Sequence, residues 1–168
     1  YRQTLFSDST QAYYDSKTYT KILNNCIPSF DTEALSKLSG PAWVINPFVG
    51  SNFFDSRKRR GIFDTLSEEK IVEGKQLILS GSEGDAWDAQ DISIDIDLRG
   101  KTNPMQLFSL LSHPNVEGVI SYDTYTAHVA SLVAKKLTVI AKSEENIDKV
   151  SQRFVPFLGK SPAEIQVL

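Results

Sequence analysis

The residues best placed to do chemistry form a turn from Asp123 to His128, with the sequence Asp-Thr-Tyr-Thr-Ala-His. An acidic residue just before a helix can accept hydrogen bonds from amides two or three residues on, so we expect Asp123 to cap the next helix. Free amides and the helix dipole at such a terminus favour an anion. Thr124 and Thr126 add hydroxyl donors, and His128 adds a ring N–H one turn further on. The turn therefore predicts an anion-binding site. The alternative is a plain helix cap followed by a half-buried histidine.

The elements that must position this turn alternate between strands and helices. Short apolar runs at residues 43–45, 77–79, 119–120 and 137–140, and an alternating stretch at 92–98, are typical of strands. The segment Asn103-Pro104-Met105-Gln106 predicts a helix start, because it offers an N-cap, a proline at the first helical position and a glutamine three residues after the cap. Further helices are expected over about 14–25, over 31–38, after Asp123, after Ser143 and from the capping box Ser161-Pro162-Ala163-Glu164 to the end of the chain.

This alternation predicts an α/β fold, a Rossmann-like parallel sheet with helices on both faces. Ligands of such sheets bind beyond the carboxyl ends of the strands, which is where the turn at Asp123 falls. The length of 168 residues suits one domain with a real core. We expect a helical interdomain region over 1–40 and the Rossmann-like domain over 41–168.

Composition narrows the class of partner and compartment. The net charge of −3 gives no general attraction to nucleic acid. Cys26 has no second cysteine to pair with, so a reducing, cytoplasmic compartment is expected. No apolar run approaches the roughly 20 residues that span a bilayer, and no signal peptide is recognisable. The chain opens on Tyr1, so we expect a piece of a longer protein.

Four motifs follow one another between Pro41 and Ala141. They are Val44-Ile45-Asn46-Pro47 through Arg59, Leu98-Arg99-Gly100-Lys101-Thr102, the segment from Ser121 to Leu132, and Lys136-Leu137-Thr138-Val139-Ile140. In this order they resemble four elements of the bacterial ADP-heptose:lipopolysaccharide heptosyltransferases. Those elements are a strand with a Pro-Gly loop and Lys-Arg-Trp segment, a Leu-x-Gly-Lys element, the Asp-Ser/Thr-Gly-x-x-His hallmark and a closing strand. The resemblance implies the C-terminal half of a two-Rossmann-domain (GT-B type) glycosyltransferase, with the N-terminal acceptor domain absent from this chain.

The resemblance also implies which residues bind an activated sugar such as ADP-heptose. The positions that match the family's substrate-binding residues are Ser51, Asn52, Lys58 or Arg59, Glu83, Lys101, Thr102, Asp123, Thr124, Thr126 and His128. The first four and the hallmark turn would hold the diphosphate, with a basic residue as countercharge. Glu83 would accept the ribose hydroxyls, and Lys101 and Thr102 would flank the base. The acceptor would be a lipopolysaccharide-like or other glycan or glycolipid. No metal or cofactor is implied, and the family's general base lies in the N-terminal domain. We therefore expect this chain alone to bind nucleotide weakly and to transfer nothing.

Several of these residues have a competing interpretation. The basic run Arg57-Lys58-Arg59-Arg60 could be a solvated charge run, or a contact with anionic lipid headgroups at the inner membrane face. Glu83 could be a surface loop residue. Tyr125 stands where the family has glycine, which favours a non-catalytic interaction module on a degenerate glycosyltransferase scaffold. The choice between enzyme and module stays open at this point.

Four other features are interpreted as structural. Asp95-Ile96-Asp97 matches a metal-binding Asp-x-Asp pattern. The alternation of apolar and polar residues there predicts a strand, and both acids would then lie on its solvent-exposed face. His113 is expected at a helix end, and Trp43 and Trp87 are expected to pack. A receiver-like signalling domain would need an acidic pair after the first strand, and that strand ends in Asn46-Pro47.

Overall fold

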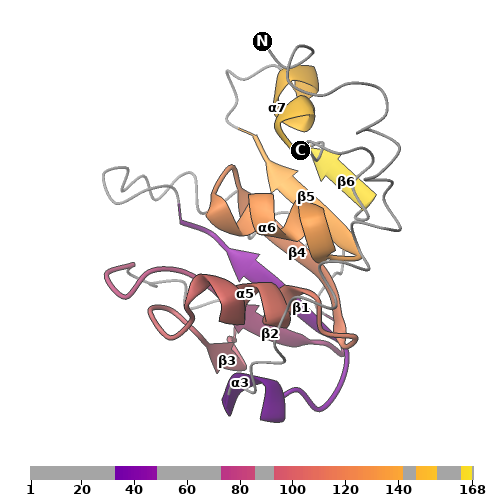
Figure 1. The fold of residues 1–168 in the computed structure, drawn as a ribbon. Helices are drawn as coiled ribbons and strands as arrows, with labels where there is room; N and C mark the ends of the chain where they lie inside the picture. Colours follow the sequence, from indigo (N-terminus) through magenta and orange to yellow (C-terminus); the bar gives the residue numbers. More distant parts are fainter. Residues whose placement is uncertain (1–32, 49–72, 86–92, 142–146, 155–163, 168) are drawn as a thin grey trace, which may run out of the picture.

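A six-stranded, all-parallel sheet organises the protein. The computed structural model describes residues 33–48, 73–85, 93–141, 147–154 and 164–167 (Figure 1). The strands are β1 (Ala42–Asn46), β2 (Gln76–Leu79), β3 (Ile96–Asp97), β4 (Val116–Tyr122), β5 (Lys136–Ile140) and β6 (Glu164–Val167). The helices are α3 (Glu33–Ser36), α5 (Pro104–Leu111), α6 (Tyr125–Val133) and α7 (Ile147–Arg153). The strand order β3-β2-β1-β4-β5-β6 is that of the Rossmann fold. The predicted α/β parallel sheet is thus confirmed.

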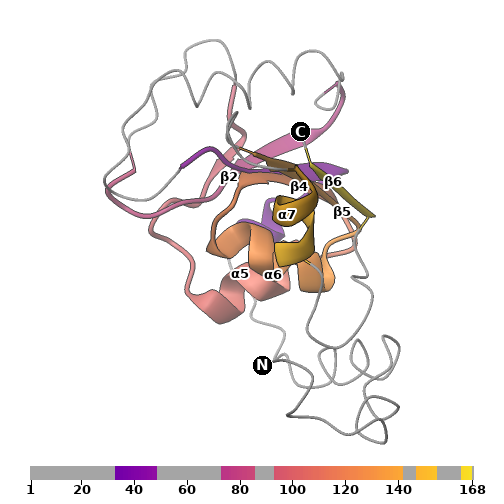
Figure 2. The same cartoon turned by 90° about the horizontal axis from the view of Figure 1, so that it is seen from above.

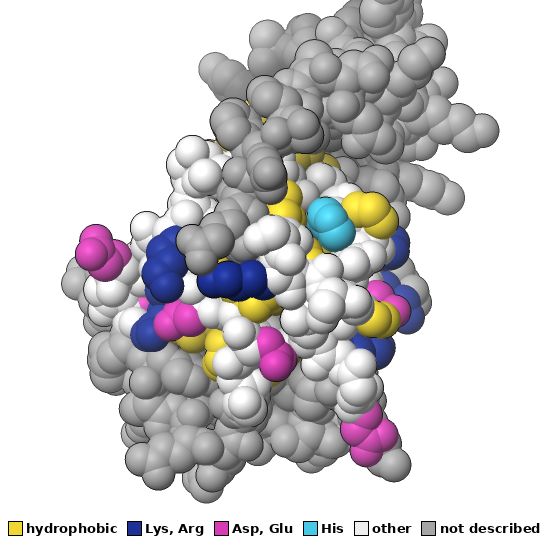
Figure 3. Space-filling view, turned by 90° about the horizontal axis from the view of Figure 1, so that it is seen from below, with side chains coloured by type: hydrophobic (Ala, Val, Ile, Leu, Met, Phe, Trp, Pro, Cys, Tyr) yellow, Lys and Arg dark blue, Asp and Glu magenta, His cyan; other side chains and the backbone are white. Residues whose placement is uncertain are grey.

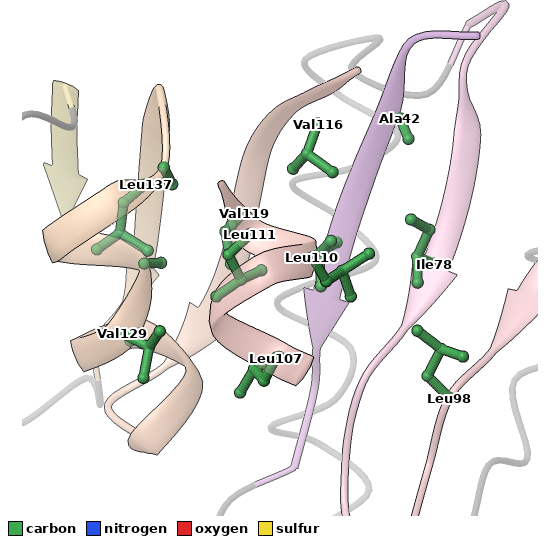
Figure 4. Packing of buried hydrophobic residues seen from close by; sticks show 14 of the residues in the cluster. Ala42, Ile78, Leu98, Leu107, Leu110, Leu111, Val116, Val119, Val129 and Leu137 are labelled. Atoms are coloured by element: carbon green, nitrogen blue, oxygen red, sulfur yellow. The ribbon is translucent and has the colours of Figure 1, made fainter. Parts of the chain in front are cut away.

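The central strands are buried on both faces. All five residues of β1 are buried, and the side chains of the first four alternate between two apolar clusters. Ala42 and Val44 belong to the larger cluster, which also takes in residues of α5, α6 and α7. Figure 4 shows part of this cluster, with residues of α5 and α6 packed over the strands. Trp43 and Ile45 belong to the smaller cluster on the opposite face. Near-continuous apolar runs are what a parallel strand buried on both faces requires.

The described helices share one face of the sheet. In Figure 2, α5, α6 and α7 lie on the same side of the strands. Leu35 of α3 and Val150 of α7 pack into the same cluster as Leu107 and Val129. The prediction of helices on the other face falls on residues outside the described part of the chain. None of the described helices is both long and apolar enough to cross a membrane.

The predicted start of α5 is confirmed in detail. The Asn103 side chain accepts a hydrogen bond from the Gln106 amide at 2.9 Å, and the Gln106 side chain accepts one from the Asn103 amide at 2.9 Å. Pro104 occupies the first helical position, where a missing N–H costs nothing. This reciprocal cap fixes where the chain leaves β3 and turns back across the sheet.

The predicted C-terminal helix is wrong. Residues 164–167 form β6, parallel to β5, with Ile165 opposite Leu137 and Val167 opposite Val139. The β-branched Ile165 and Val167 suit a strand, and β5 offers unpaired backbone groups along its edge. Pairing with the sheet therefore outweighs the local capping signal.

Candidate functional site

The turn after β4 lies at the point where the strand order reverses. The chain passes from β1 to β2 and β3 on one side, and β4 then pairs with β1 on the other side. A crevice beyond the carboxyl ends of two such strands is where open α/β sheets bind ligands. Asn46, the last residue of β1, donates its side-chain amide to Thr126 Oγ1 at 2.7 Å. The end of β1 and the start of α6 are therefore held together at this switch point.

The prediction that Asp123 caps α6 is wrong. Thr124 is the N-cap, with φ −136° and ψ 172°, and Asp123 stands one residue before it. The Asp123 carboxylate lies 3.2 Å from His128 Nε2 and 2.6 Å from an Arg153 guanidinium nitrogen. Residues just before the cap and four after it often pack together across a helix start. Asp123 and His128 occupy these two positions, so their polar contact closes the start of α6 in the way that two apolar side chains often do.

The first amides of α6 have no capping side chain among the described residues. Thr124 makes no capping hydrogen bond, because its hydroxyl lies 2.8 Å from Ser121 Oγ. No acidic residue lies in the first turn of the helix. The amides of residues 125–127 therefore keep the electropositive character that favours an anion at a helix start.

Two predicted phosphate contacts take on other roles. Thr126 is only 3% exposed, and its hydroxyl oxygen is engaged by Asn46. His128 is half exposed, directs Nε2 to Asp123 and stacks on Phe154 with ring centroids 4.8 Å apart. Both residues therefore brace the turn through contacts within the protein.

Tyr125 occupies the first position of α6 and is 57% exposed. A side chain at this position stands beside the open amides. The exposed ring of Tyr125 therefore belongs to the same helix start as these amides.

The loops after β2 and β3 are packed against each other at the same edge of the sheet. Gly100, with φ +65°, approaches Glu83 so closely that a Cβ there would lie 2.6 Å from the Glu83 Cβ. Gly100 also donates its amide to the Gly81 carbonyl at 2.9 Å. Phe48, just after β1, leaves no room for a Cβ on Gly81. The structure thus brings Glu83 next to the segment that carries Lys101 and Thr102, as a shared nucleoside site would require.

An ion pair stabilises these two loops. The Arg99 guanidinium contacts the Asp97 carboxylate at 2.6 Å and donates to the Asp85 carbonyl at 2.6 Å. The hydrogen bond from Arg99 holds the pKa of Asp97 below its ordinary value, partly offset by burial, and the same bond raises the pKa of Arg99. Lys101 donates its ammonium to the Asp97 carbonyl at 3.0 Å. Asp97 is therefore a structural anchor.

The Asp-x-Asp pattern does not form a metal site in the described part of the chain. Asp95 accepts a hydrogen bond from the Leu77 amide at 2.7 Å, whereas Asp97 pairs with Arg99. No group of three or more His, Cys, Asp or Glu side chains gathers there within metal-binding distance. The two acids have separate structural partners, but the predicted strand over 92–98 is wrong in its length, because β3 covers only Ile96–Asp97 and Asp95 stands before it.

His113 and Trp43 also have structural contacts. His113 accepts a hydrogen bond from the Asn115 amide at the end of α5, and the Trp43 ring packs on Gly118. Ser51, Asn52, Lys58, Arg59 and Trp87 lie outside the described residues.

Sequence reasoning missed Asn46, Arg153 and Phe154 as parts of the site. Asn46 had one visible signal, because a polar residue that ends a wholly apolar strand needs a partner. Arg153 and Phe154 come to the turn from the end of α7, and nothing in their local sequence indicates this. Figure 3 shows that basic and acidic side chains lie beside one another on the face it draws, without a continuous basic surface.

Comparison with known proteins found no matching family model, no similar curated protein and no similar solved structure.

Proposed function

We propose that the carboxyl edge of the sheet, at β1 and β4, binds the diphosphate of a nucleotide sugar. The observation that carries this proposal is the start of α6, which presents uncapped amides at the topological switch point of the sheet. A diphosphate there would accept hydrogen bonds from the amides of residues 125–127. Glu83 and the segment at Lys101, on the β2–β3 side of the same edge, would face the nucleoside.

The reaction we infer is glycosyl transfer by a two-domain enzyme of the GT-B type. Fixed amides and the helix dipole would stabilise the charge that develops on the departing nucleotide diphosphate. By resemblance, Lys58 or Arg59 would supply a countercharge. The acceptor, a glycan or glycolipid at the cytoplasmic face of the membrane, and the general base would be held by an N-terminal domain of the same protein. ADP-heptose is the donor that the resemblance suggests.

A non-catalytic interaction module is the second candidate. The exposed ring of Tyr125 favours this candidate, because tyrosine is enriched at protein interfaces and this side chain is over half exposed. Under this interpretation the same edge would bind no nucleotide.

The test is a pair of substitutions at two helix starts in the intact protein. Thr124→Asp places a carboxylate at the N-cap of α6, where it should cap the amides and keep the helix stable while repelling an anion. Asn103→Asp makes the same kind of change at the N-cap of α5. Calorimetry with ADP, UDP, GDP and inorganic pyrophosphate should show at least a tenfold loss of affinity for Thr124→Asp and little change for Asn103→Asp.

Amide NMR shifts give an independent measurement of the same site. Added nucleotide should shift the amides of residues 125–127, and a nucleoside portion should also shift those of Glu83 and Gly100. If no nucleotide or pyrophosphate shifts any of these amides in the intact protein, the interaction module is favoured and the proposed function is wrong.

A further inference from the structure

We propose that Arg153 is a positioning residue that keeps the Asp123 carboxylate from competing with an anion at the start of α6. The inference rests on the proposed function, because it explains how that site tolerates an acidic neighbour. Arg153 would touch no ligand and would act through Asp123.

The need for such a residue follows from where Asp123 stands. A carboxylate one residue before an N-cap is attracted by the same amides and the same helix dipole that would attract a phosphate. Its charge would also repel a ligand anion across the short distance of one turn. An anion site beside Asp123 therefore needs the carboxylate to be turned aside and its charge to be balanced.

The structure provides both effects through the end of α7. Arg153 approaches one carboxylate oxygen of Asp123 at 2.6 Å, and His128 lies 3.2 Å from the other oxygen. The Asp123 side chain is 27% exposed, so solvent screens this pair less than a fully exposed one. With both oxygens directed at these partners, the carboxylate leaves the first amides of α6 open.

His128 alone does not provide the same balance. The guanidinium of Arg153 keeps its charge at every relevant pH, and it lies closer to the carboxylate, at 2.6 Å against 3.2 Å for His128 Nε2. His128 is also fixed against Phe154, a ring that is 1% exposed. His128 therefore orients the carboxylate, and Arg153 supplies the permanent countercharge.

A purely structural role for Arg153, as a tie between α7 and the turn, makes a different prediction. If the tie alone mattered, removing the charge of Asp123 could not compensate for the loss of Arg153. If charge matters, Asp123→Asn should restore binding to a protein that lacks Arg153. This rescue separates the two roles even though Arg153 makes further contacts.

The experiment measures inorganic pyrophosphate and ADP affinity in four forms of the intact protein. These are the wild type, Arg153→Gln, Asp123→Asn and the double variant. We expect Arg153→Gln to lose about tenfold in affinity, since an unbalanced unit charge one helical turn from an anion is worth about that factor between the limits of bulk water and a protein surface. Asp123→Asn should bind at least as tightly as the wild type, and the double variant should return to within about threefold of it.

Two controls keep the outcome interpretable. Gln152→Ala changes the exposed neighbouring residue of α7 and should leave affinity unchanged. Arg153→Lys keeps the charge and should retain most of the affinity.

Each outcome decides something. Equal affinity of wild type and Arg153→Gln overturns the inference alone, and so does a loss that Asp123→Asn fails to rescue. Absence of any binding by the wild type overturns the proposed function and this inference with it.

Discussion

Asn46 and Thr126, 80 positions apart in sequence, are joined by a buried hydrogen bond of 2.7 Å between Nδ2 and Oγ1. Asn46 is 7% exposed and Thr126 3% exposed, so neither group has water as an easy substitute partner. Asn46 also accepts a hydrogen bond from the Phe48 amide at 3.2 Å, which shapes the chain as it leaves β1. This one side chain therefore fixes both sides of the switch point.

We predict a measurable coupling between Asn46 and Thr126. Thr126→Val removes the acceptor and leaves the Asn46 amide buried without it, which should cost about 1–3 kcal/mol of stability. In a double-mutant cycle with Asn46→Ala, the coupling free energy should be about 1 kcal/mol, measured by urea unfolding. Thr126→Ser keeps the hydroxyl and should keep the coupling. Strict additivity of Thr126→Val and Asn46→Ala would contradict the bond.

Three glycines form a graded test of the loop geometry. Gly84 has open space and an ordinary φ, Gly74 has open space but φ +70°, and Gly100 combines φ +65° with the close approach of Glu83. Replacement by alanine should therefore cost little at Gly84 and about 1–2 kcal/mol at Gly74, from left-handed strain alone. The cost should be largest at Gly100, where the backbone of Glu83 must also move. Thermal unfolding of the three variants measures the order, and a Gly100→Ala protein as stable as Gly84→Ala would refute it.

Most of the fold is predictable from the sequence because its signals are local and agree with one another. The runs at 43–45, 77–79 and 137–140 are strands, and the capping box at Asn103 begins a helix. At the C-terminus the local signal and the tertiary context disagree. The capping pattern there predicts a helix, but the edge of β5 offers backbone partners that no local pattern reveals.

The site is predictable in location and less so in its contacts. Ligands of parallel sheets bind at the carboxyl ends of strands. This rule, together with the acid, the threonines and the histidine after β4, predicts a site at the turn that begins with Asp123. What each side chain does there depends on partners brought in by other elements. Asp123 contacts Arg153 where a helix cap was predicted, and Thr126 accepts a hydrogen bond from Asn46. Neither contact could be predicted, because both partners lie far away in the sequence.

The cap of α5 should stabilise the protein as long as residue 103 has a side-chain oxygen that accepts from the Gln106 amide. Asn103→Ala removes the side chain that accepts from the Gln106 amide and should cost about 1 kcal/mol. Asn103→Ser and Asn103→Asp keep an acceptor and should cost clearly less. Urea unfolding compares the three, and an Asn103→Ala protein no less stable than Asn103→Ser would show that water replaces the cap at no cost.

The acid side of the stability profile should depend on two separate ion pairs. Arg99 holds the pKa of Asp97 below its ordinary 3.8, and Lys75, 2.8 Å from Glu117, holds the pKa of Glu117 below its ordinary 4.5. A pKa that is lower in the folded state means that the ionised form is favoured by folding. The resulting stabilisation is present above the unfolded-state value and is lost as pH falls through the folded-state value.

Crossed substitutions should separate the two pairs. Arg99→Gln should raise the pKa of Asp97 toward 3.8 and leave that of Glu117 unchanged, whereas Lys75→Gln should raise only the pKa of Glu117. Carboxyl-carbon NMR titration reads each group directly. Both pairs are partly exposed, so their contribution to stability should be small, and the gap between wild type and variant should close as pH falls below the ordinary values. A shift of both carboxyl groups in either variant would mean that the β3 loop and the β4 edge are coupled, contrary to the separate contacts seen in the structure.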